Sequence, residues 1–152
     1  MIRKLGWATA LLLLAPAAPA AAADSTTVNL DMSNFRFCKH APCTPMDQGY
    51  VRNPTGGAVP GTDMEIIDVP AGATVVWTYR DSFCDAFEMC PGHMVMLEDG
   101  TAMGKKVGFA AAREGETKVT YQVTEPAGTL IRYFCNVNSH DQLGQTGVLR
   151  VV

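Results

Sequence analysis

The sequence predicts an all-β fold, a sandwich or barrel of short and mainly antiparallel strands. Short runs rich in Val, Thr, Trp and Tyr alternate apolar with polar residues, as strands with one buried face do. Clusters of Gly, Pro, Asn and Asp separate these runs at regular intervals, which is typical of sandwiches. The chain also shows no repeat, no coiled-coil heptad and no second domain.

The expected strands differ in how clearly they alternate. In the run 73–80, Val75, Trp77 and Tyr79 share one face. Residues 38–63 carry many turn-forming residues and are expected to form a long irregular excursion. Residues 109–113, within 105–116, could form one or two helical turns. The expected strands are 27–37, 64–69, 73–80, 93–97, 117–123, 129–135 and 147–152.

The first 23 residues have the order of a secretory signal. Two basic residues precede an apolar stretch, and small residues follow it up to Ala23. An uncleaved membrane anchor is the alternative, but two prolines interrupt the apolar core. We therefore expect a single domain, 24–152, which is periplasmic or secreted and has no stable membrane insertion after cleavage.

Removing Arg3 and Lys4 from the 12 basic residues leaves ten against 15 acidic ones, a net charge of about −5. No basic stripe is present, so a nucleic-acid partner is not expected. Five cysteines cannot all pair within one chain in an oxidising compartment, so one of them needs another role.

The segment 133–145 supplies that role. Cys135 leaves an expected strand, His140 follows after four residues, and Gln145 lies five residues further on. A thiolate and an imidazole around one point suit copper in both oxidation states. His93, at the start of the expected strand 93–97, is the candidate for a third ligand. His40, between Cys38 and Cys43, is the competing histidine.

These residues resemble the cupredoxins, the type 1 blue copper family. The run 69–77 is similar to the family's turn and strand before the first ligand, and 93–95 to its His-x-Val motif. The Cys-x4-His-x4-Gln loop, which ends at Gln145, is stellacyanin-like. The resemblance implies a cupredoxin-like Greek-key β-sandwich, one type 1 copper ion, and single-electron transfer. It also implies His93, Cys135, His140 and Gln145 as metal ligands, with the Gly92 carbonyl as an alternative axial donor.

Several alternatives stay open. Cys38, Cys43, Cys84 and Cys90 could pair locally or between the two segments, and local pairs are favoured. A copper carrier would use the same ligands with added methionines (Met89, Met94, Met96, Met103), although these can equally fill core space. A metal-free, disulfide-stapled binding module is a third hypothesis. An enzyme is not expected, because copper enzymes of this fold need further domains and more histidines.

We expect a monomer that meets an unidentified redox partner protein near His140, whose edge should reach the surface beside Val137 and Leu143.

Overall fold

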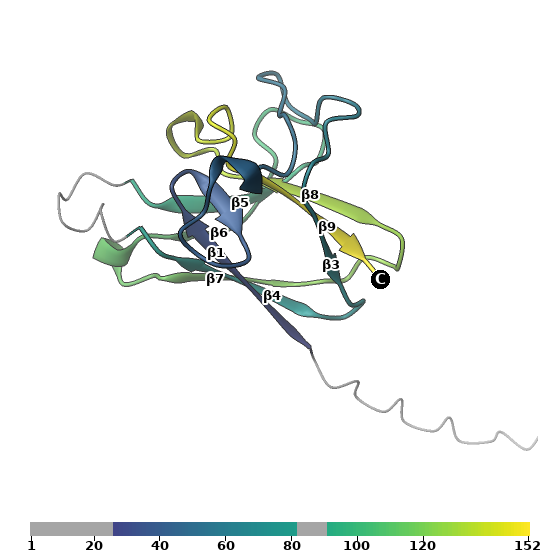
Figure 1. Ribbon diagram of the computed structural model, residues 1–152, viewed down its shortest axis with the longest axis horizontal. Coiled ribbons are helices and arrows are strands. Elements are labelled where there is room, and N and C mark those ends of the chain that lie inside the picture. The colour runs from purple at the N-terminus through teal and green to yellow at the C-terminus, as the bar shows by residue number, and fades with distance from the viewer. Residues whose placement is uncertain (1–25, 82–90) are drawn as a thin grey trace, which may run out of the picture.

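The computed structural model describes residues 26–81 and 91–152, which form two packed β-sheets (Figure 1). The expected all-β sandwich is thereby confirmed. Within these residues no helix is long and apolar enough to cross a membrane. The predicted signal, 1–23, lies outside the described residues. One sheet has the order β2 (Arg36–Cys38), β1 (Thr27–Ser33), β4 (Thr74–Tyr79), β7 (Lys118–Gln122); the other has the order β3 (Ile66–Val69), β9 (Thr146–Val151), β8 (Leu130–Phe134), β5 (His93–Leu97), β6 (Lys105–Ala110).

The strand pairs of the described residues are mainly antiparallel, as expected, and two of them are parallel. β1 lies parallel to β4, and β3 lies parallel to β9. Parallel neighbours cannot be joined by a tight hairpin, and each of these pairs is separated by a long stretch of chain. Strand lengths and turn residues depend only on local connections, so the sequence pattern could not predict which strands pair in parallel.

The expected single strand 27–37 is divided into β1 and β2 by a tight turn. Its two central residues, Asn34 and Phe35, have φ angles of 51° and 56°. A two-residue hairpin of this kind requires positive φ at both central positions, and Asn adopts that conformation more readily than most residues. Asn34 is therefore the local residue that indicates this turn. A bulky residue such as Phe35 seldom adopts positive φ, so the pair was not interpreted as a hairpin.

The expected helical turns near 109–113 are a strand and a short 3-10 turn instead. β6 runs to Ala110 and pairs with β5, in the register His93↔Ala110. Only Ala112–Glu114 forms a 3-10 helix. Pairing with β5 therefore overrides the helical tendency of the alanines in this segment.

The core lies between the two sheets and centres on aromatic side chains. Val75, Trp77 and Tyr79 are buried on the inner face of β4, as the alternation predicted. Tyr133 of β8 packs edge-on against Trp77, with ring centroids 5.1 Å apart. This packing holds β8 firmly against the opposite sheet up to the residue that precedes Cys135.

Residues 39–65, between β2 and β3, contain the 3-10 turn η1 (Pro45–Asp47) and a single isolated bridge, Arg52↔Ala58. A disulfide joins Cys38 to Cys43, which confirms the favoured local pairing for these two cysteines. Cys84 and Cys90 lie outside the described residues. In Figure 1 the loops of this segment project from the same end of the sandwich as the loop between β8 and β9.

Candidate metal centre

Three neighbouring strands bring the candidate residues to one end of the second sheet. β8 ends at Phe134, directly before Cys135, and β9 begins at Thr146, directly after Gln145. Phe134 pairs with Thr146 across these strands and with Met96 of β5 on the other side. His93 is the first residue of β5, so the antiparallel register brings it back towards Cys135.

The loop between β8 and β9 folds back on itself through backbone hydrogen bonds. The Asp141 N–H donates to the Cys135 carbonyl at 2.9 Å, and the Gln145 N–H donates to the His140 carbonyl at 2.9 Å. Asn138 and Ser139 have φ angles of 44° and 60°, which reverse the chain just before His140. The result is that His140 faces back towards the end of β8.

His93, Cys135 and His140 therefore form one buried cluster. Each offers one ligand atom, and the three atoms lie within 4.8 Å of one another. The Cys135 Sγ lies 3.5 Å from the His140 Nδ1, and the two imidazole centroids are 5.3 Å apart. A soft thiolate with two imidazoles is the donor set that copper and zinc accept.

The two ring nitrogens of His93 have different surroundings. Nε2 lies 2.6 Å from the Asp81 Oδ2. Nδ1 is buried and has no hydrogen-bond partner among the described residues. Leaving a buried polar atom unpaired costs about 1–3 kcal/mol, so the nitrogen is in a position that a bound cation would satisfy. The residues present thus fit a metal ion.

Gln145 places a fourth polar atom next to this cluster. Its side chain is fully buried, and its Oε1 lies 3.2 Å from the His140 Nδ1. The Gln145 Nε2 donates to the Arg36 carbonyl at 3.4 Å, which orients Oε1 towards the histidine. Gly92, the alternative donor, has a φ of 78°, and a Cβ there would lie 2.6 Å from the Ala110 oxygen. The backbone thus demands glycine at this position, but the choice of axial donor stays a prediction.

Burial sets the protonation of the metal-free cluster. It raises the pKa of the Cys135 thiol to about 11, although N–H groups of Met94 and Val137 partly offset the effect. Burial, and then the nearness of His93, lower the pKa of His140 to about 4. At neutral pH the thiol and the His140 ring are therefore both uncharged. A metal ion that binds here must displace the thiol proton, and no proton from His140 competes with it.

The expected exposure of the His140 edge is wrong. His140 is 3% exposed, because the ring of Phe35 lies edge-on against it with centroids 4.7 Å apart. Phe35 itself is 41% exposed and Leu143 is 55% exposed. The β1–β2 turn therefore covers the histidine, and an aromatic ring occupies the surface expected for the imidazole.

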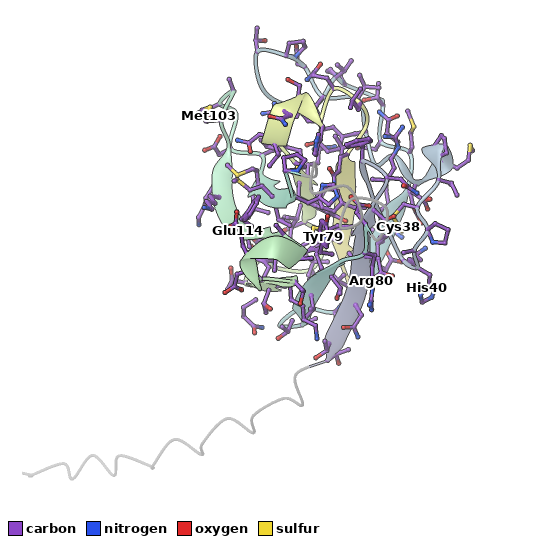
Figure 2. The ribbon with its side chains drawn as sticks, turned by 90° about the vertical axis from the view of Figure 1, so that its left-hand side faces the viewer. Cys38, His40, Tyr79, Arg80, Met103 and Glu114 are labelled. Atoms are coloured by element: carbon purple, nitrogen blue, oxygen red, sulfur yellow. A yellow bond between two sulfur atoms is a disulfide. The ribbon has the colours of Figure 1, made fainter. Side chains whose placement is uncertain are left out.

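The competing residues lie elsewhere. His40 is exposed, and Figure 2 shows it at the periphery of the molecule, close to Cys38. Met103 is 67% exposed at another edge of the view (Figure 2). Met96 is buried and Met94 packs against the core, so both have the structural role weighed for them. Met89 lies outside the described residues.

Two polar residues that support the cluster were missed in the sequence. Asp81 contacts His93, as described above. Arg52, from the long excursion, forms ion pairs with Glu98 at 2.6 Å and with Asp141 at 2.9 Å. Asp141 directly follows His140, so this arginine ties the excursion to the loop. Each residue is one of many charged side chains, and neither lies in a pattern that would single it out.

No family model matches this chain, and no curated protein matches it. Solved structures that are similar to this chain include a plastocyanin and several variants of amicyanin. An oxidised plastocyanin from Dryopteris crassirhizoma is 16% identical, covering 82% of this chain and 99% of its own, with a TM-score of 0.47. A variant of amicyanin in its reduced form is 15% identical, covering 87% of each chain, with a TM-score of 0.47. A second reduced amicyanin variant, in the Cu(I) form at pH 4, is 18% identical, covering 91% of this chain and 92% of its own, with a TM-score of 0.46.

Proposed function

We propose that this chain is an exported mononuclear type 1 copper protein that carries single electrons between redox partners. One observation supports the proposal above the others. A buried thiol and two buried imidazoles converge within 4.8 Å, and one imidazole nitrogen has no other partner among the described residues. Two histidines and one cysteine with a weak axial ligand are the donor set of blue-copper electron-transfer sites.

In this proposal the Cys135 Sγ and the Nδ1 atoms of His93 and His140 would hold the metal. The Gln145 Oε1, or alternatively the Gly92 carbonyl, would supply a further, weaker donor. Copper supplies a one-electron couple between Cu(II) and Cu(I) when it is bound. The chain fixes the donors at the start of β5, directly after β8 and in a hydrogen-bonded loop, so little needs to move when the charge changes. Burial keeps water away, and Cys135 gives up its proton when the metal binds.

The face over His140 is where we place electron entry and exit. Phe35 is partly exposed and contacts the His140 ring, and Leu143 on the ligand loop is exposed. A small apolar face suits the weak, brief interfaces of redox proteins. The partner is a redox protein whose identity the chain does not reveal. We further propose that the protein acts outside the cytoplasm, and the Cys38–Cys43 disulfide supports an oxidising compartment.

The other two functions have less support. A copper carrier would present its thioethers around the metal, whereas Met96 is buried and Met94 packs against the core. A metal-free binding module would not explain a buried ring nitrogen without a partner. An enzyme would need an open coordination position on the metal for its substrate. In the proposal the side chains of the cluster occupy the positions around the metal.

The test is voltammetry of the mature chain, residues 24–152, loaded with one equivalent of Cu(II). We expect a single reversible one-electron couple. Cys135→Ser should abolish it, and His40→Ala, a matched histidine control on the exposed disulfide loop, should leave it unchanged. A wild-type protein without a reversible couple would refute the proposal, and so would a couple that survives Cys135→Ser. Rapid transfer of Cu(I) from wild type to an acceptor, together with an affinity for Cu(I) that falls when Met94 and Met96 are replaced, would favour the carrier instead.

A further inference from the structure

Asp81 is a buried carboxylate that the electron-transfer proposal leaves without a role. It lies two residues after β4 ends at Tyr79, and it is 8% exposed. Its Oδ2 lies 2.6 Å from the His93 Nε2. β4 belongs to one sheet and His93 to the other, so this contact joins the two layers directly at the candidate metal centre.

The Asp81 carboxylate is also held in place by residues at the turn between β1 and β2. Its Oδ1 accepts a hydrogen bond from the Asn34 N–H at 2.8 Å, and the Ser33 side chain also bonds to it. Asn34 owes its orientation to the left-handed turn between β1 and β2. The adjacent residue of that turn, Phe35, covers His140. One turn therefore fixes the partner of one histidine and the covering of the other.

The surroundings of the His93 ring indicate where its proton lies. Nε2 faces the Asp81 Oδ2, whereas Nδ1 is buried and has no hydrogen-bond partner among the described residues. A carboxyl group is ordinarily ionised at neutral pH, and an ionised carboxylate can only accept hydrogen bonds. A proton on Nδ1 would be a buried donor without an acceptor, whereas a proton on Nε2 is donated to Asp81. The geometry therefore places the proton on Nε2, which leaves the lone pair on Nδ1.

We propose that Asp81 is a positioning residue that fixes His93 as the Nε2–H tautomer with Nδ1 directed into the site, and that its full negative charge lowers the reduction potential. The inference rests on the proposed copper function. A ligating histidine generally gives its second N–H to a carboxylate, a carbonyl or water, and this partner raises ligand basicity. A carboxylate differs from a carbonyl or water because its charge favours Cu(II) over Cu(I).

Two variants separate the charge from the hydrogen bond. Asp81→Asn keeps an acceptor oxygen for His93 but loses the charge. Asp81→Leu keeps the branched shape of the side chain, with larger groups, and loses both. Asp68→Asn is the matched control, because it removes one charge from an exposed pair with Arg150. Arg150 lies five residues along β9 from Gln145, which is about 16 Å of strand.

The first measurement uses the metal-free protein and nitrogen-15 NMR of the His93 ring. We expect the Nε2–H tautomer in wild type and in Asp68→Asn, and a mixture of tautomers in Asp81→Leu. A wild-type ring that carries its proton on Nδ1 would overturn the inference. So would a single Nε2–H tautomer in a folded Asp81→Leu protein. If that variant does not fold, the wild-type tautomer and the Asp81→Asn potential decide the matter.

The second measurement is the reduction potential of the copper-loaded proteins. We expect Asp81→Asn to change the ratio of Cu(II) to Cu(I) affinities at least tenfold in favour of Cu(I), a rise of about 59 mV for one electron. A potential equal to that of Asp68→Asn would overturn the role of the charge. If wild type binds no copper at all, the proposed function fails. The NMR result then still decides whether Asp81 sets the tautomer of His93.

Discussion

Replacement of Arg52 tests whether the long excursion holds the ligand loop in place. The guanidinium is buried and makes ion pairs with Glu98 and Asp141. It also donates to the carbonyls of Thr101 and Ala102 at 3.3 and 2.8 Å. Its Cζ lies 3.5 Å from the centroid of the Phe134 ring, next to Cys135 in the chain. Arg52→Met keeps the apolar stem and removes the charge.

The expected loss follows from the groups left behind. Breaking a buried ion pair by removing one partner destabilises a protein by about 3–5 kcal/mol. Glu98 keeps hydrogen bonds from the Tyr50 hydroxyl at 2.8 Å and the Gly57 N–H at 3.2 Å, and Asp141 keeps one from Gln142 at 3.2 Å. These remaining donors place the expected loss near the lower limit, at about 3 kcal/mol.

The assay is urea unfolding of the metal-free protein, with the free energy extrapolated to water. The matched control is Arg150→Met, which breaks an exposed pair with Asp68 and should change stability little. The triple variant Arg52→Met, Glu98→Gln, Asp141→Asn removes both stranded charges and should recover at least half of the loss. A loss below about 1 kcal/mol for Arg52→Met, or a triple variant no more stable than it, would refute the reasoning.

Four further predictions concern the cluster itself. Gln145→Met should raise the potential in voltammetry, because a thioether favours Cu(I) over Cu(II), and an unchanged potential would remove Gln145 as the axial donor. The His140 side chain binds a proton below about pH 6.5 in the unfolded chain, but only below about pH 4 in the folded protein. The metal-free protein should therefore lose stability as pH falls through this window. The loss is at most about 3 kcal/mol, and it should shrink in His140→Gln when unfolding is followed at several pH values. The pH dependence due to Cys135 is opposite. Burial raises the pKa of its thiol from 9.0 to about 11, so the folded protein should lose stability as pH rises above 9.0. Cys135→Ser should reduce that alkaline loss. Phe35→Ala should expose His140 and speed the loss of copper to a chelator, and an unchanged rate would deny Phe35 its covering role.

The parts of the fold that were predictable are those encoded locally. The alternation in β4 gave the buried face of Val75, Trp77 and Tyr79, since a strand's period of two is written directly in the chain. The spacing of Cys135 and His140 likewise lies within one loop between adjacent strands. Their convergence with His93 depends on the cross-strand register of β5 and β8, which the sequence does not show. His93 was predicted from its place at a strand start and because the chain has only three histidines.

The parts that were missed depend on contacts between distant segments. The Asp81 carboxylate is 12 residues from His93, and Arg52 is 89 residues from Asp141. Neither pair forms a local motif, and 15 acidic residues offer many equivalent partners. The covering of His140 by Phe35 was missed for the same reason. It depends on a two-residue turn that lies far from the ligand loop in the sequence.

The most direct test of the copper assignment is a titration of the metal-free mature chain with Cu(II), followed by its visible spectrum. We predict that one copper per chain produces an intense thiolate-to-copper band, which is absent in Cys135→Ser and unaffected in His40→Ala. Absence of the band in wild type, or its persistence without the Cys135 thiol, would contradict the account.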